Sequence, residues 1–262
     1  MNENRKRIGV LDSGVGGLTV VKELERQLPH EDIVYFGDNK HCPYGNRTAD
    51  NIVEIARSTI GFLREQGIKA VVVACNTTSS LLPRFQAEYP FPIFGIIGPV
   101  ARAVARRGLP AVGVIATELT IRTGAYERLI HENDPSIAVY SEPSHNLAAL
   151  VDCGEFDLDA IRAEVKGHLD HMLTAYPLGH VLYGCTHYPI VSEVFEQAAP
   201  GVEFINPACA QVAAAAEYLR SNNLLNDTGG GRFDIYMSGS APVYQAVLER
   251  LAIKTPAVIH SV

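Results

Sequence analysis

Short apolar runs along this chain alternate with segments in which apolar residues recur every three or four positions. The apolar runs cover residues 8–11, 33–36, 71–74, 93–99, 111–117, 181–184, 203–206 and 233–239. Runs of this length predict buried strands, and the periodic segments between them predict helices. Because a crossover helix joins strands that run parallel, the alternation predicts an α/β fold with mainly parallel sheets.

Capping and breaking residues bound several of the expected helices. One helix follows the glycine-rich turn 12–17 and stops at Pro29, and another lies between Thr48, a capping residue, and Gly67. Further helices are expected after Asp157 or Asp159, over residues 211–219, and through Leu248 and Leu251. These helices are the crossovers that a parallel sheet requires.

The second half of the chain repeats the pattern of the first. The strand expected at 111–117 matches the first strand when Gly113 is aligned with Gly9. Cys75 follows Gly9 by 66 positions, and Cys185 follows Gly113 by 72. This spacing predicts an internal duplication, and so two pseudo-symmetric, doubly wound α/β domains. No low-complexity linker separates the halves, so we expect a tight interface between them.

Composition and charge narrow the class of protein. The 262 residues are 47% hydrophobic and 19% charged, which is sufficient for substantial cores. The net charge is -7 and no basic stripe is present, so we expect no nucleic-acid partner. No apolar run has the length of a membrane span or the pattern of a signal peptide, so we expect no membrane partner and a cytoplasmic protein.

The five cysteines do not have the spacing of a disulfide framework, and two of them indicate a cleft. The five are Cys42, Cys75, Cys153, Cys185 and Cys209. Without a CxxC pair they indicate no zinc site, and we expect no metal. A cysteine after an apolar strand is usually an inert core residue, but Cys75 and Cys185 occupy matching points of a repeat. Parallel sheets bind ligands at the carboxyl ends of their strands, so we expect one cysteine on each wall of one cleft, and the others are interpreted as structural.

Two thiols on opposite walls suit a reaction that inverts a carbon centre. One base removes a proton from one face, and the second group returns a proton to the other face. His187 is placed to assist Cys185. Asp12 is placed to assist Cys75, to bind a substrate ammonium group or to cap a helix. Donors suited to a substrate carboxylate follow the same strands: Asn76, Thr77, Thr78 and Thr186.

Other classes of function stay open at this point. A thiol-redox or metal-binding protein would need the two cysteines within bonding distance, or further ligands beside them. A binding module would keep the cleft without the chemistry. The turn 12–17 resembles a dinucleotide-binding turn only in part, because the third glycine is not at the expected place. None of the six lysines lies in a candidate site turn to form a Schiff base with pyridoxal phosphate, and we predict no cofactor.

Five motifs together resemble the bacterial glutamate racemases over nearly the whole chain. They lie at residues 12–18, 35–38, 43–45, 74–77 and 184–189. The resemblance implies a cofactor-independent interconversion of L- and D-glutamate that supplies D-glutamate for peptidoglycan. It also implies one domain of residues 1–97 plus 208–262 and a second of residues 98–207, facing each other across one cleft. A homodimer is one assembly that we consider, because the sequence does not determine the oligomeric state.

The same resemblance assigns roles to individual residues. Cys75 corresponds to the base that takes the proton from D-glutamate, and Cys185 to the base for L-glutamate. Asp12 and His187 correspond to the polar assistants of the two thiols, and Asp152 stands where the family has a glutamate that assists the Cys185 side. The matching substrate-binding positions are Asp12, Ser13, Pro43, Tyr44, Gly45, Asn76, Thr77, Thr186 and His187.

The chain departs from the family pattern around the cleft. Residues 39–42 read Asn-Lys-His-Cys where Thr-Ala-Arg-Val is usual, Gly98 replaces a common glutamate, and residues 206–207 replace Asp-Ser. These differences concern substrate size, closure and regulation more than the type of reaction. A racemase of aspartate or another acidic amino acid therefore stays open. The chain begins close to its first strand, so we expect no activation by a cell-wall precursor.

Overall fold

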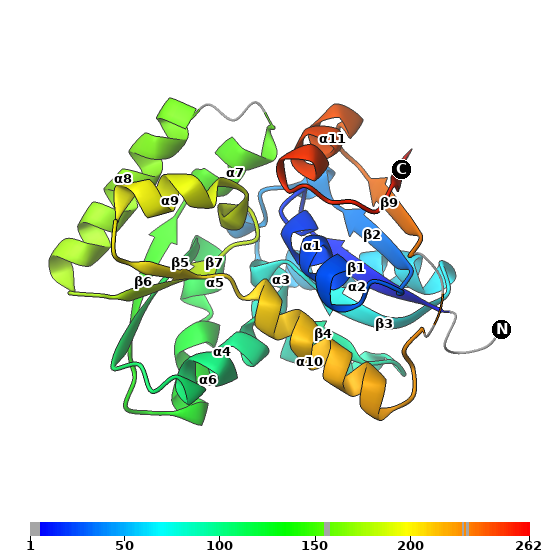
Figure 1. Ribbon diagram of the computed structural model, residues 1–262, viewed down its shortest axis with the longest axis horizontal. Helices are drawn as coiled ribbons and strands as arrows, with labels where there is room; N and C mark the ends of the chain where they lie inside the picture. Colours follow the sequence, from blue (N-terminus) through cyan, green and yellow to red (C-terminus); the bar gives the residue numbers. More distant parts are fainter. Residues whose placement is uncertain (1–5, 155–157, 227, 229–230) are drawn as a thin grey trace.

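The computed structural model describes residues 6–154, 158–226, 228 and 231–262, and shows an α/β fold with two sheets (Figure 1). Within these residues the first sheet has six strands, in the order β10-β9-β2-β1-β3-β4, and the second has four, in the order β6-β5-β7-β8. The first-sheet strands are β1 (Arg7–Asp12), β2 (Ile33–Gly37), β3 (Ile68–Val73), β4 (Ile93–Gly95), β9 (Phe233–Met237) and β10 (Ala257–Ser261). The second-sheet strands are β5 (Ala111–Thr117), β6 (Ala138–Ser144), β7 (His180–Gly184) and β8 (Glu203–Ile205). All neighbouring strands pair in parallel, which confirms the predicted fold class.

The two sheets share one strand order, as the repeat predicts. The order β2-β1-β3-β4 in the first sheet corresponds to β6-β5-β7-β8 in the second. Gly9 and Gly113 lie on the equivalent strands β1 and β5, and Cys75 and Cys185 follow the equivalent strands β3 and β7. In the described part of the chain, β9 and β10 extend the first sheet beyond β2 without a counterpart in the second.

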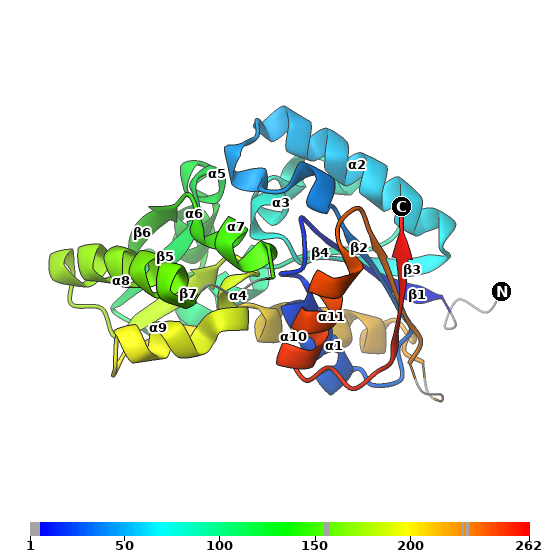
Figure 2. The same cartoon turned by 90° about the horizontal axis from the view of Figure 1, so that it is seen from above.

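Helices cover both faces of each sheet. Figure 2 shows α2 (Ala49–Glu65) on one face of the first sheet, and α1 (Leu18–Gln27) and α10 (Ala208–Ser221) on the other. In Figure 1 the second sheet lies between α8 (Leu158–Ala175) with α9 (Ser192–Ala198) and α4 (Ile97–Arg106) with α6 (Ala125–Asn133). The other helices include α3 (Asn76–Ser80), α5 (Glu118–Arg122), α7 (Leu147–Asp152) and α11 (Ala241–Arg250). No helix of the described residues is long and apolar enough to cross a membrane.

The crossover helix α2 illustrates how local sequence builds these layers. The Thr48 hydroxyl accepts a hydrogen bond from the backbone N–H of Asn51 at 3.2 Å, as its predicted capping role requires. Ile60 and Leu63 on the inner face of the helix are fully buried in a core with the first sheet. Each such side chain contributes about 1.5–3 kcal/mol by leaving water.

One local prediction is wrong, and one of the two alternatives of another is excluded. The strand expected over 93–99 ends with β4, and α4 begins at Ile97. Pro99 lies in the first turn of α4, where a backbone N–H has no helical acceptor and the proline therefore loses no hydrogen bond. Asp159 lies inside the first turn of α8 rather than before it. The alternative cap, Asp157, lies outside the described residues.

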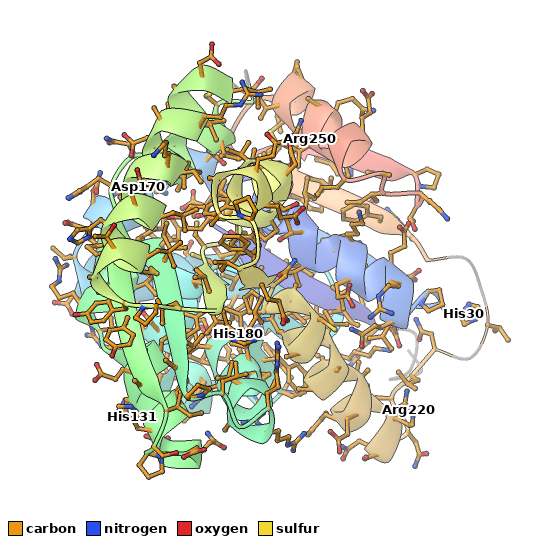
Figure 3. The ribbon with its side chains drawn as sticks, turned by 60° about the vertical axis from the view of Figure 1, so that its left-hand side comes forward. His30, His131, Asp170, His180, Arg220 and Arg250 are labelled. Carbon is orange, nitrogen blue, oxygen red and sulfur yellow. The ribbon has the colours of Figure 1, made fainter. Side chains whose placement is uncertain are left out.

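Contacts join the two sheets through segments from both halves of the chain. Helix α10 packs against both α1 and α4. Arg250 lies on α11 and is labelled in Figure 3. Its guanidinium donates to the Ile190 carbonyl at 2.7 Å and pairs with Glu193 of α9. The strands divide between two sheets in the way that two domains would require, but the domain boundaries at residues 97 and 207 stay a prediction.

Candidate active site

A small cavity lies where the carboxyl ends of β3 and β7 approach each other. Its volume is about 20 Å³, roughly the room that one water molecule needs. The lining from the first-sheet side is Ser13, Cys42, Pro43, Tyr44, Gly45, Cys75, Asn76 and Thr77, and from the second-sheet side Thr117, Ala148, Cys185, Thr186 and His187. The structure therefore brings the two cysteines of the repeat to one cavity. All of the predicted substrate-binding residues line it except Asp12.

The Cys75 thiol is buried at the junction of β3 and α3. Its residue is 3% exposed. Burial and the nearby Asp12 charge raise the pKa of Cys75 to about 11, although hydrogen bonds with Thr78 oppose this. Cys75 is therefore a neutral thiol near pH 7, which is the form that donates a proton.

Cys185 has a different environment, because an imidazole and a carboxylate lie beside it. Its Sγ is 3.5 Å from Nδ1 of His187, whose Nε2 is 2.8 Å from Oδ1 of Asp152. Burial lowers the pKa of His187, but the hydrogen bonds with Asp152 and Cys185 outweigh it and hold that pKa well above 6.5. Burial likewise opposes ionisation of Asp152, but His187 holds the pKa of that carboxyl below its usual range. The Cys185 sulfur therefore lies beside a cation that is itself held by a carboxylate.

Asp152 reaches His187 because the glycine-rich turn leaves space for its carboxylate. A Cβ placed on Gly14 would come within 3.0 Å of Asp152 Oδ1. Any other residue at position 14 would therefore displace the carboxylate or the turn. The side chain at 152, one methylene shorter than the glutamate of the resemblance, is accommodated by this close approach.

Asp12 stands behind the cavity and organises its surroundings. Its Oδ2 accepts hydrogen bonds from the backbone N–H of Gly17 at 2.9 Å and of Gly14 at 3.3 Å. The Thr186 hydroxyl, from the second-sheet side, donates to Oδ1 at 3.2 Å. Asp12 thus fixes the glycine-rich turn without being the residue that caps α1, which is Gly17. Its role beside a thiol or an ammonium group stays a prediction.

Burial of Asp12 predicts a specific dependence of stability on pH. Burial raises the pKa of Asp12 from 3.8 to about 6, against the opposing effects of His187 and the turn N–H groups. The unfolded chain therefore ionises this group first, and its stabilising contribution, full below pH 4, is lost as the pH rises to 6. The loss amounts to about 3 kcal/mol. Urea unfolding of the wild type and of Asp12→Asn should show this difference between pH 4 and 7, and parallel pH curves would contradict it.

Hydrogen bonds between the two sides of the cavity involve the polar residues that follow β3. The Tyr126 hydroxyl donates to Asn76 Oδ1 at 2.6 Å, and the Thr77 hydroxyl is 2.9 Å from that of Thr117. Within the described residues, Asn76 Nδ2 is buried without a hydrogen-bond partner. An amide donor on the cavity lining is suited to a carboxylate of a bound ligand.

Three lining residues were not among the predicted site residues. Cys42, interpreted as structural from its sequence context, lines the cavity, and burial with the Asp152 charge raises the pKa of its thiol far above 9. Thr117 aligns with Ser13 in the repeat, so the repeat contained the signal for it. Ala148 has no polar group, and the sequence held no signal for it.

Comparison with known proteins places this geometry in one family. A family profile described as Asp/Glu/hydantoin racemase matches residues 8–215. A protein of Thermus thermophilus named glutamate racemase is 36% identical over 259 residues, which cover 98% of this chain and 97% of the relative.

Solved structures agree over nearly the same length. The glutamate racemase isoform RacE1 of Bacillus anthracis superposes with a TM-score of 0.89 at 33% identity, covering 98% of this chain and 97% of the other. The glutamate racemase of Francisella tularensis, solved in complex with D-glutamate, superposes with a TM-score of 0.87 at 32% identity, covering 99% and 98%.

Proposed function

Because the chain belongs to the Asp/Glu/hydantoin racemase family, we propose that it interconverts L- and D-glutamate by proton transfer at Cα. The observation that carries the proposal is the pair Cys75 and Cys185, which line one cavity from equivalent strand ends. The glutamate racemases to which the chain is similar cover almost all of it. The enzyme is therefore an isomerase of a small-molecule substrate.

The proton transfers use one thiol on each side of the substrate. With L-glutamate, the Cys185 thiolate takes the Cα proton, and the electron pair left on Cα takes a proton from the Cys75 thiol on the opposite face. D-glutamate leaves with Cys185 as a thiol and Cys75 as a thiolate. The reverse reaction runs through the same groups in mirrored roles, so no proton is gained or lost over the cycle.

The different environments of the two sulfurs support these roles. His187, a cation held by Asp152, lies beside the Cys185 sulfur, whereas burial favours the thiol of Cys75. The donors Ser13 and Asn76 on the cavity lining are suited to the carboxylates of the substrate.

Deuterium exchange at Cα tests the proposed function directly. Purified protein in D₂O, without added cofactor, should exchange the Cα proton of both glutamate enantiomers and invert each one. Aspartate, tested in parallel, should exchange far more slowly. Exchange on aspartate alone would identify aspartate as the substrate in place of glutamate. Exchange on neither amino acid would overturn the proposal.

Four further points are proposals. The D-glutamate formed supplies peptidoglycan synthesis, the enzyme acts in the cytoplasm, and it assembles as a homodimer. Residues 1–97 with 208–262 form one domain, and residues 98–207 form the other. Light scattering on the preparation used for exchange measures the assembly.

A further inference from the structure

The Asp152 carboxylate is held from the first-sheet side as well as by His187. Asp152 ends α7, which follows strand β6 of the second sheet. Its Oδ1 accepts a hydrogen bond from the backbone N–H of Val15 at 2.9 Å, and its Oδ2 accepts one from the Asn39 amide at 3.1 Å. Val15 lies in the turn after β1, and Asn39 follows β2. The group that holds His187 therefore bridges the two sides of the cavity.

The Asn39 amide has one orientation that satisfies its neighbours. The Tyr244 hydroxyl donates to Asn39 Oδ1 at 2.7 Å, and Nδ2 then faces Asp152. Exchanging the two amide atoms would set an oxygen acceptor against the carboxylate. Tyr244 is fully buried on α11. Its hydroxyl also lies 3.1 Å from the Gly14 carbonyl, but that contact is the longer of the two and the carbonyl already accepts from Tyr35.

Glycines leave the space that this arrangement needs. A Cβ on Gly239 would come within 3.0 Å of Asn39 Cγ, and one on Gly37 would overlap the Tyr244 hydroxyl. As described above, Gly14 admits Asp152 in the same way. Three glycines, at positions 14, 37 and 239, thus leave room for the side chains of Asp152, Tyr244 and Asn39. Hydrogen bonds join these three side chains in series.

We propose that Asn39 and Tyr244 are positioning residues that hold the Asp152 carboxylate, and through it His187, against Cys185. Neither Asn39 nor Tyr244 is part of the described cavity lining, so they act through Asp152 rather than on the ligand. The consequence for catalysis rests on the proposed function. The C-terminal helix α11 thereby contributes to the chemistry on the far side of the cavity.

Kinetics of Asn39→Ala test the catalytic consequence. Loss of the amide donor releases one oxygen of Asp152, and kcat for glutamate should fall roughly 10-fold while KM stays within about 2-fold. Adding Asn39→Ala to Asp152→Asn should cost nothing more, because both changes act through one carboxylate. Tyr244→Phe, which removes only the hydroxyl, should lower kcat in the same direction by less.

The matched control makes the same change at an exposed amide. Asn133 Nδ2 donates to the Leu129 carbonyl at 2.8 Å on α6, away from the cavity. Asn133→Ala should leave kcat, KM and the state of His187 unchanged.

Nitrogen-15 resonances of His187 test the positioning without any activity. The signal is assigned by its loss in His187→Asn. The titratable groups facing His187 are Asp152 on α7, Asp12 at the end of β1 and Cys185 in its own turn. Asn39→Ala changes none of these three groups but removes the hydrogen bond from Asn39 to Asp152. We therefore expect His187 to become protonated at a pH about 1 unit lower than in the wild type.

The outcomes separate the two proposals. An unchanged His187 titration in Asn39→Ala would overturn the positioning role, whatever the enzyme acts on. Wild-type protein without glutamate exchange would overturn the proposed function, while the His187 titration still decides the positioning. If Asn39→Ala does not fold, the decision passes to Tyr244→Phe, where an unchanged titration counts against the proposal.

Discussion

Replacing Cys75 or Cys185 singly by serine abolishes the interconversion of L- and D-glutamate, with a loss of roughly 10³-fold or more in kcat. A serine hydroxyl keeps the shape of the thiol, but its proton is held too tightly at pH 7 for either transfer. The two variants differ in what survives. Cys75→Ser retains Cys185 and should still exchange the Cα proton of L-glutamate without inverting it. Cys185→Ser should do the same with D-glutamate but more slowly, because the raised pKa of Cys75 keeps most of that thiol protonated at pH 7. Chiral chromatography with mass spectrometry after incubation in D₂O measures both.

The matched control for these variants is Cys209→Ser, because Cys209 is exposed on α10 and is not part of the cavity lining. It should racemise glutamate at the wild-type rate. Circular dichroism should show that all three variants are folded, since the change removes little volume from the core. Normal racemisation in either active-site variant would exclude the two-thiol mechanism.

His187→Asn lowers kcat by roughly 10²-fold, because Cys185 loses the cation that lies 3.5 Å from its sulfur. Asp152→Asn should have a smaller effect, since the imidazole remains beside the thiol but is no longer held as a cation. The double variant should resemble His187→Asn alone, because Asp152 acts through His187. Steady-state kinetics in both directions measure the three proteins.

The single and double variants should also differ in their free energy of unfolding. His187→Asn leaves the largely buried Asp152 carboxylate with its hydrogen bonds from Val15 and Asn39 but without its cation, which costs up to about 3–5 kcal/mol. The double variant removes that charge and should recover much of the loss in urea unfolding. If the double variant fell a further 10-fold or more below His187→Asn in kcat, Asp152 would have a role independent of His187.

The repeat made much of the fold and of the site predictable from sequence. Apolar runs defined the inner strands, because a strand covered on both faces needs continuous apolar residues. The edge strands β6 and β10 were not predicted, because both are largely half-exposed or exposed and therefore lack a continuous apolar run. Pro143 within β6 obscured the pattern further, although a proline is tolerated at the edge of a sheet.

The contacts of the site were less accessible to sequence reasoning. Cys75 and Cys185 were placed by their matching strand ends, and a strand end determines where a side chain emerges. The contact of Asp152 with Asn39 depends on how the two sheets face each other, and that is set by packing over the whole molecule. Cys42 reaches the cavity for the same reason, and no local pattern distinguishes it from a structural cysteine.

The contribution of β9 and β10 to the first sheet has a consequence for synthesis on the ribosome. Strand β2 leaves the ribosome about 200 residues before its neighbour β9. The strands of the second sheet lie within residues 111–205, so that sheet is complete first. Until β9 emerges, the nascent chain carries β2 as an open edge, whose unpaired backbone groups can pair with other chains. Chaperone contact during translation should therefore concentrate on the first third of the chain and end only when its last strands emerge.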